Sequence, residues 1–321
     1  MRRRIKKKVV AFFAIGFIMV IAIIVSIIMI VNYNKKIHSI PYKLEKLGYQ
    51  QEEIDFFEDF TQKENAKPSM DEILNHPYHK ELAVFLKEKY FIYNNLERYL
   101  SYKDKHTELT TTEVVSLVNV NRDYEYYEHV QKTDTNKENI MLVNKYYALD
   151  KDFVFDDLVD VSIQHCYGNQ KVREEVYDKF KQMFNDAKKE NLTIIINSSY
   201  RTYDYQEGLW NNYARQHDEA WADNYAARAG HSEHQTGLTI DVTTYGVKEQ
   251  GDFENTDEFA WMQENAHKYG FILRYPKNQE NITGYSYESW HYRYVGVDVA
   301  TKIYEEGITF DEYYAFYLNE E

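Results

Sequence analysis

Several residue types that restrict a fold are scarce in this chain of 321 residues. The single cysteine, Cys166, excludes an internal disulfide, and a domain of this size can be stable without one. We interpret it as a small buried hydrophobe rather than a nucleophile, because the adjacent His165 would point elsewhere on a strand or helix. Only 4 prolines and 12 glycines argue against a disordered or fibrous chain.

Positive charge is also in deficit. The chain has 38 lysines and arginines against 52 aspartates and glutamates, which gives a formal net charge of -14. Such an acidic surface repels phosphate backbones, so the composition argues against nucleic acid as a partner. Aromatic residues, by contrast, make up 16% of the chain. The length is sufficient for one or two domains with hydrophobic cores.

Charge of either sign is missing from Val9 to Val31. As a helix rising about 1.5 Å per residue this run spans about 34 Å, more than a bilayer core of about 30 Å. Six positive charges precede it in residues 1–8 and predict a cytoplasmic tail by the positive-inside rule. We predict a single-pass signal anchor over 9–31 in the cell membrane, with the rest of the chain extracellular. A cleaved signal peptide is the alternative, but the run is long and no small-residue cleavage site follows it.

Residues 32–139 carry no motif with evident chemistry. Apolar residues at steps of three and four predict helices from about Leu44 onward, including one helix face formed by Leu82, Phe85, Leu86, Tyr90, Tyr93 and Leu96. The polar stretch 132–139 is typical of a linker. We interpret 32–139 as an extracellular helical stem, with a binding surface for wall polymer or a partner protein as the alternative. Nothing in this region predicts an oligomeric state.

From residue 140 to 321 the pattern changes to short strands that alternate with helices. Residues 172–190 predict an amphipathic helix, 192–197 a buried strand, and 203–215 a second helix. The run "LTIDV" predicts a strand, 257–269 a helix that Gly270 ends, and "WHYRYVG" another strand. Two helices follow, the last beginning at a capping box formed by Thr309 and Glu312. Short strands among helices predict an α+β fold with a small sheet rather than a doubly wound parallel sheet.

Two histidines and a carboxylate are candidate metal ligands. His234 lies in a glycine-containing turn, and Asp241 lies between Ile240 and Val242 on the strand that follows. A carboxylate on a buried strand is costly unless it is paired, hydrogen-bonded or bound to a metal. Further on, His291 follows Trp290. Two histidines and one carboxylate leave an open position on a catalytic zinc for water, whose pKa the metal lowers towards about 7.

Glu288, three residues before His291, is the candidate general base for that water. On a regular strand these two residues would face opposite ways. Glu288 must therefore lie in a bend or bulge before the strand if both reach one site. The spacing alone leaves a metal site and an ordinary polar turn both open, and the remaining histidines have no supporting context.

Four sequence motifs resemble those of a known family. "SEHQTGLTIDV" (232–242) and "ESWHYRYVG" (288–296) resemble two motifs of the VanY-type D-alanyl-D-alanine carboxypeptidases, in the LAS group of zinc peptidases. "SSYRTYDYQ" (198–206) resembles their arginine-bearing turn, and "LVNKYYALDKDFVFDDLV" (142–159) the start of their catalytic domain. The resemblance covers about 180 residues, in the same order as the family motifs. It implies a small, mainly antiparallel sheet flanked by helices, the LAS/Hedgehog-like zinc peptidase fold.

The resemblance also implies roles for individual residues. It makes His234, Asp241 and His291 the ligands of Zn2+ and Glu288 the catalytic base. Arg201 would hold the carboxylate of the substrate or the developing oxyanion, since its donors are planar and permanently charged. The pocket residues implied beside Arg201 are Gln206, Ser232 and Trp290. His231 and Glu233 are not expected to bind the metal.

The implied reaction is removal of the terminal D-Ala from peptidoglycan stem peptides. Related enzymes act as L,D-carboxypeptidases, as D-Ala-D-Ala dipeptidases or as endopeptidases, and these remain alternatives, as does a non-catalytic wall-binding protein. Ala229, Thr239 and Phe155 depart from residues that are common in the family motifs. None of the three is an expected ligand, so the departures bear on loop rigidity and pocket detail.

Overall fold

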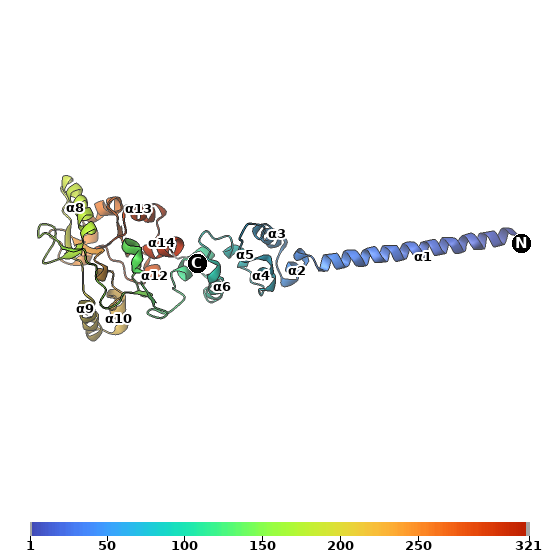
Figure 1. Cartoon of the computed structure of the whole chain (residues 1–321), viewed down its shortest axis with the longest axis horizontal. Coiled ribbons are helices and arrows are strands. Elements are labelled where there is room, and N and C mark those ends of the chain that lie inside the picture. Colours follow the sequence, from blue (N-terminus) through green and yellow to red (C-terminus); the bar gives the residue numbers. More distant parts are fainter. Residues whose placement is uncertain (1, 319–321) are drawn as a thin grey trace. The chain divides into compact units, whose positions relative to one another are not determined.

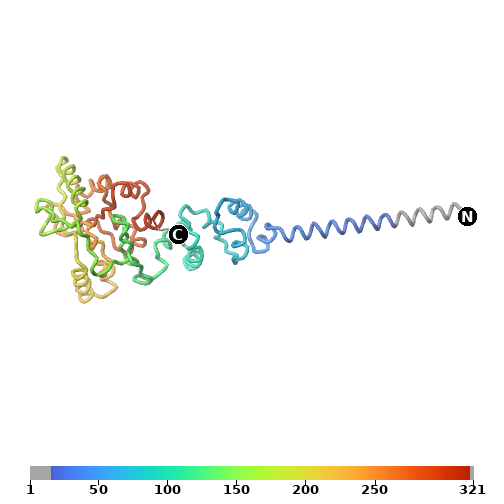
Figure 2. Tube along the Cα trace, viewed as in Figure 1, coloured from blue at the N-terminus to red at the C-terminus, as the bar shows by residue number. Residues whose placement is uncertain are grey.

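The computed structural model describes residues 2–318, with side chains from Gly16 onward (Figures 1 and 2). The chain divides into two compact units, Met1–Leu96 and Glu97–Glu321. The basic tail predicted at 1–8 begins outside the described residues, and its side chains are not described. The catalytic motifs all lie in the second unit. This unit begins at Glu97, well before the boundary at 139/140 that composition suggested.

Helix α1 (Arg2–Ile37) contains the long apolar run. Within the described residues, Gly16–Ile37 is the one helix long and apolar enough to cross a membrane. Its side chains are exposed in the isolated chain, among them Phe17 and Met29. Length and composition fit an anchor, and a signal sequence near the N-terminus passes the same test.

The rest of the first unit consists of short helices. They are α2 (Ile40–Leu47), α3 (Gln51–Phe60), α4 (Met70–Asn75), α5 (Leu82–Phe85) and the 3-10 turn η1 (Tyr93–Asn95). Leu44, Ile54 and Phe57 are buried between them. The single long helix face predicted from Leu82 to Leu96 is wrong. Helix α5 ends after four residues, and the chain turns before Tyr93, because local apolar spacing does not show where a chain reverses.

The second unit opens with α6 (Leu96–Lys105) and α7 (Thr111–Asn119). The polar stretch 132–139 does not separate it from the motifs, because this stretch is packed into the unit. Arg293, fully buried, donates from Nη2 to the carbonyls of Asn139 (3.1 Å) and Met141 (2.7 Å). Polar side chains can face solvent while their backbone carbonyls cap a buried guanidinium. The predicted linker at 132–139 thus lies within the second unit.

Three small sheets lie among helices in this unit, as the α+β prediction expected. Strands β1 (Gln131–Lys132) and β2 (Tyr147–Ala148) form a parallel pair, and β3 (Leu158–Asp160) and β4 (Lys171–Arg173) an antiparallel pair. The third sheet has four antiparallel strands in the order β5-β6-β8-β7. Their bounds are Ile195–Ser198, Thr239–Thr243, His291–Tyr294 and Phe271–Leu273. The chain between residues 195 and 294, which contains these four strands, runs from yellow to orange-red in Figure 2.

Helices surround the four-stranded sheet. They are α8 (Glu174–Lys189), α9 (Tyr203–Gln216), α10 (Glu219–Tyr225), α11 (Asp257–Asn265), α12 (Glu280–Thr283), α13 (Val297–Glu306) and α14 (Phe310–Tyr317), joined by the 3-10 turns η2 (Thr135–Ile140), η3 (Glu233–Thr236), η4 (Gln250–Asn255) and η5 (Ala266–Tyr269). The buried face of α8 matches the predicted one and includes Val176, Phe180 and Met183. Acidic residues begin this helix and lysines end it, as the helix dipole favours.

The main core lies against one face of the sheet. It includes Ile240 and Val242 of β6 together with Phe180 of α8, and Cys166 is buried within it as predicted. Gly270 ends η5 with a φ of +88°, and a Cβ there would lie 2.5 Å from Cε2 of Tyr294. The predicted glycine stop is therefore confirmed. The alternation along β6 leaves Asp241 on the opposite face from the core.

Candidate active site

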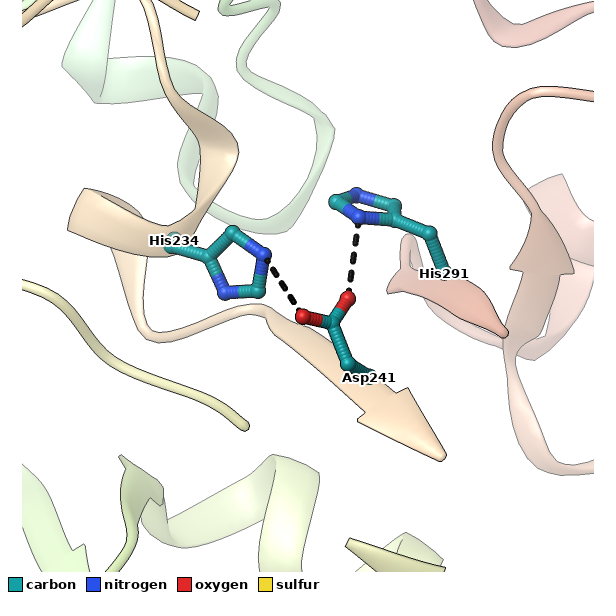
Figure 3. A group of neighbouring side chains, drawn as sticks. All are labelled: His234, Asp241 and His291. Carbon is teal, nitrogen blue, oxygen red and sulfur yellow. Dashed lines mark ion pairs between the residues drawn. The ribbon is translucent and has the colours of Figure 1, made fainter. Parts of the chain in front are cut away.

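His234, Asp241 and His291 meet on the face of the four-stranded sheet that lies opposite the core. Antiparallel pairing of β6 with β8 sets Asp241 directly opposite His291, and η3 brings His234 to the same point (Figure 3). Nε2 of His234 lies 3.4 Å from Oδ2 of Asp241, and Nδ1 of His291 lies 3.2 Å from Oδ1. One ligand atom from each residue falls within 4.8 Å of the others, and all three residues are buried. These distances are compatible with one metal ion.

The two histidine rings face Asp241 with different nitrogens. Nδ1 of His234 lies 2.7 Å from the carbonyl oxygen of Ser199, which can only accept a hydrogen bond. The proton of a neutral His234 ring is therefore on Nδ1, and Nε2 keeps its lone pair towards the site. His291 has the opposite orientation, with Nδ1 towards Asp241 and Nε2 towards Glu233 at 3.6 Å.

The protonation of the cluster is strongly coupled. Burial lowers the pKa of His234 to about 4, and the charge of Arg201 acts in the same direction. Burial would also lower the pKa of His291, but its contacts with Asp241 and Glu233 outweigh that effect and raise it to about 9. Without a metal the cluster thus holds a proton on His291. A cation that binds here must displace that proton, which makes binding pH-dependent.

Glu288 lies in the same site, as the base hypothesis requires. It precedes a turn at Ser289 and Trp290, and strand β8 begins only at His291, so the predicted bend before the strand is present. Oε2 of Glu288 lies 3.4 Å from Nδ1 of His291. Burial, supported by the negative charge of Asp241, raises the pKa of Glu288 to about 7. A nearby cation would favour its charged form.

Arg201 reaches the site from the turn between β5 and α9. Its Nη2 donates to Oδ2 of Asp241 (2.9 Å) and to Oγ of Ser198 (2.8 Å). A bulge after Ile196 places Ser198 opposite Asp241 in the sheet, and the chain turns there towards Arg201. The side chain of Arg201 is 21% exposed, and it borders the cavity. It can therefore contact both a ligand carboxylate and an incoming anion.

All eight residues singled out from the sequence line one cavity of about 310 Å3. They are Arg201, Gln206, Ser232, His234, Asp241, Glu288, Trp290 and His291. Nε2 of Gln206 donates to the carbonyl of Ala227 (2.8 Å), which fixes the amide against the cavity wall. Ser232 is buried beside the turn that carries His234. The predicted substrate-binding residues therefore share one pocket with the triad.

Sequence reasoning missed much of the cavity wall. Tyr213, Trp221 and Tyr225 from the hairpin α9–α10 line one side, and Tyr275, Tyr285 and Tyr287 are also lining residues. Helices α9 and α10 lie side by side (Figure 1). Rings of Trp221 and Tyr225 stack at 4.4 Å. Tyr213 has the spacing of an ordinary apolar position in the predicted helix 203–215, and that spacing carries no signal that would distinguish a pocket wall from a core.

A buried ionic network behind His291 was also missed. Oε1 of Glu233 accepts from Nε of Arg274 and Nη1 of Arg293, both at 2.8 Å. Arg274 also pairs with Asp311 of α14, which accepts from Asn144. Burial would raise the pKa of Glu233, but the two guanidiniums outweigh it and hold that pKa far below its usual range. Glu233 is outside the ligand triad, on the far side of His291.

Gly237→Ala should weaken both the fold and the metal site. Gly237 has a φ of +66°, in the left-handed region, and an added Cβ would lie 2.6 Å from Cδ2 of Leu158. We expect a loss of about 1–3 kcal/mol in unfolding free energy, because strain and overlap act together. Urea unfolding measures the loss. Gly246→Ala is a matched control, since that glycine also has positive φ but has nothing within 4 Å of an added Cβ. Equal losses in both variants would show that overlap at Gly237 is unimportant.

Comparison with known proteins places the chain in a family. Residues 169–297 match the family model VanY, described as D-alanyl-D-alanine carboxypeptidase. The chain is 40% identical to "Putative carboxypeptidase YodJ" of Bacillus subtilis (strain 168) over 59% of this chain and 74% of that protein. It is 37% identical to a D-alanyl-D-alanine carboxypeptidase of Enterococcus faecium, over 60% of this chain and 63% of that one.

A solved structure shares the fold of the second unit. This is the LdcB LD-carboxypeptidase, with 39% sequence identity and a TM-score of 0.55 over 59% of this chain and 91% of that chain. The match to YodJ exceeds 30% identity and spans more than two thirds of that protein. The chain belongs to the VanY family of D-alanyl-D-alanine carboxypeptidases.

Proposed function

We propose that this protein is a zinc D,D-carboxypeptidase that removes the terminal D-Ala from peptidoglycan stem peptides. The observation that carries the proposal is the position of Glu288 beside a buried triad of two histidines and one carboxylate, in a cavity that can admit a peptide end. A set of two histidines and one carboxylate is typical of catalytic zinc sites with an open position.

The residues present fit a zinc ion. Asp241 Oδ1 is buried and accepts no hydrogen bond from any described residue. Nε2 of His234 and Nδ1 of His291 both face Asp241, and imidazole and carboxylate are ligands that Zn2+ accepts. When bound, Zn2+ supplies Lewis acidity that makes water nucleophilic near neutral pH and polarises a carbonyl group. His234, Asp241 and His291 would hold it.

The chain's own groups perform the remaining steps. Glu288 takes a proton from the attacking water through Oε2 and returns it to the amine that leaves. Arg201 holds an anionic oxygen, either the terminal carboxylate or the oxygen that gains charge in the transition state. The buried Ser232 and Gln206, with Trp290, would shape the pocket for the peptide terminus. The aromatic wall limits access of water to this end of the cavity.

The proposed location of the protein rests on helix α1. We propose that α1 anchors the protein in the cell membrane, with the N-terminus cytoplasmic and the catalytic unit extracellular, where peptidoglycan is found. Six basic residues before the apolar run support this orientation. In this arrangement the helices between the anchor and the catalytic unit act as a stem. The proposed partners are stem peptides and the membrane.

An L,D-carboxypeptidase is the second candidate. The likeness to the LdcB LD-carboxypeptidase, over 91% of that chain, favours it. Both reactions use the same zinc and base, and they differ in whether the residue before the scissile bond has D or L configuration. The choice depends on the pocket wall beside the triad, which includes Tyr213 and Trp221.

Defined stem peptides should separate these activities. The purified full chain, loaded with zinc, should remove one D-Ala from a pentapeptide ending in D-Ala-D-Ala and leave the tetrapeptide intact, as followed by mass spectrometry. Cleavage of the tetrapeptide alone would assign L,D activity, and release of alanine from free D-Ala-D-Ala would assign dipeptidase activity. Chelation should abolish turnover and added zinc should restore it. A zinc-loaded protein that binds wall but cuts none of these peptides would contradict an enzymatic function.

A further inference from the structure

Glu233 is not an expected metal ligand, and its side chain has contacts that differ from those of the neighbouring motif residues. It precedes the ligand His234 and is among the residues that line the cavity, but its side chain is fully buried. Its two oxygens serve different partners. Oε1 accepts from Arg274 and Arg293, each at 2.8 Å, while Oε2 lies 3.6 Å from Nε2 of His291.

The two arginines neutralise the carboxylate of Glu233 and also fix its orientation. Two guanidiniums hold Oε1, so the plane of the carboxylate cannot rotate without breaking a buried pair. Arg274 is in turn held by Asp311 at 2.5 Å and 3.2 Å. Within this buried group two positive charges balance two negative ones, which keeps an ionised Glu233 compatible with burial.

The fixed carboxylate of Glu233 faces the ring of His291. Its Nε2 is buried and has no hydrogen-bond partner within the described residues, and Oε2 of Glu233 lies just beyond hydrogen-bond length. A movement of about half an ångström would close that contact. An ionised carboxylate can only accept, so this contact requires the proton on Nε2. Nδ1, which faces Asp241 and Glu288, then keeps its lone pair.

We propose that Glu233 is a positioning residue that orients His291 as a metal ligand through Nδ1. The proposal rests on the zinc site of the proposed function. It gives each ligand histidine a buried acceptor on the nitrogen that faces away from the site: the Ser199 carbonyl for His234 and the Glu233 carboxylate for His291. It also connects α14, through Asp311 and Arg274, to the metal centre. Acceptors of this kind fix ring orientation and raise ligand basicity.

Zinc affinity of Glu233→Gln tests this role. The amide retains the shape but presents no anionic acceptor to His291, so we expect zinc to bind about 10- to 100-fold more weakly. Competition against a chromophoric chelator measures this in the full chain without any substrate. Asp123→Asn is the control, because it removes a largely buried carboxylate that pairs with Arg98 at 2.5 Å, outside both the cavity and the network behind His291. We expect its zinc affinity to stay near that of the wild type.

The outcomes are distinct. Equal losses of zinc affinity in the two variants would reduce Glu233 to a structural residue and overturn the proposal, as would an unchanged affinity in Glu233→Gln. If Glu233→Gln does not fold, Glu233→Asp keeps the charge for the arginines but withdraws it from His291, and its zinc affinity decides in the same way. A wild-type chain that binds no zinc would instead contradict the proposed function.

Discussion

Glu288→Gln should lower kcat about 10^2- to 10^4-fold, the contribution typical of a positioned general base. The amide occupies the volume of the carboxylate but cannot take a proton from water. Glu288 is outside the ligand triad, although it lies 3.4 Å from His291, so zinc should remain bound. Release of D-Ala from a pentapeptide measures kcat, and zinc analysis of the same sample measures occupancy.

Glu254→Gln provides the control for this experiment. Glu254 pairs with Lys277 at 2.9 Å and is outside the residues that line the cavity. Its replacement should leave kcat unchanged. A Glu288→Gln variant that turned over at the wild-type rate with zinc bound would show that another group accepts the proton. Loss of zinc from Glu288→Gln would instead show that this carboxylate helps to hold the metal.

Arg274→Met should cost about 3–5 kcal/mol of unfolding free energy, because it leaves uncompensated buried charge. Arg274 is fully buried and forms ion pairs with both Glu233 and Asp311. Without it, Arg293 and Asn144 remain as partners for the two carboxylates. Methionine retains most of the volume, so the loss reports charge rather than a cavity.

Urea unfolding followed by tryptophan fluorescence measures this loss. The four tryptophans, at 210, 221, 261 and 290, all lie in the second unit, so the signal reports that unit. Lys189→Met is the control. Lys189 pairs with Asp186 on the surface of α8, and exposed pairs contribute about 0–1 kcal/mol. Similar midpoints for Arg274→Met and Lys189→Met would show that the buried network adds no more stability than a surface ion pair.

Local patterns predicted the second unit better than the first. The buried face of α8, the glycine stop at Gly270 and the capping box at Thr309 all follow from periods and caps that involve neighbours in sequence. The strand predicted at 192–197 begins later, at Ile195, because strand ends are set by the partner strand β6. The prediction of one long helix face from Leu82 to Leu96 was wrong for a similar reason. Chain reversals depend on tertiary contacts that apolar spacing does not record.

The ligand set is where sequence reasoning reached furthest. Asp241 between two core residues, and a histidine on each of two motifs, identify candidates by chemistry and by likeness to a family. Arg201 and Glu288 were likewise found from their motifs, and the structure places both beside the triad. The aromatic wall of α9–α10 and the network behind His291 were not found. No local pattern marks a tyrosine as a pocket residue or a buried arginine as a partner of a distant glutamate.

The amino-acid sequence was sufficient for the family, the alternation of β6 and the candidate site residues, because these depend on residue type and short spacing. It could not show that Asp241 faces His291, which is fifty residues away, since strand register depends on long-range backbone pairing and burial. Nor could it show that the side chain of Glu233 is buried against two arginines. That burial depends on Arg274 and Arg293, because a carboxylate can be buried only where opposite charge meets it.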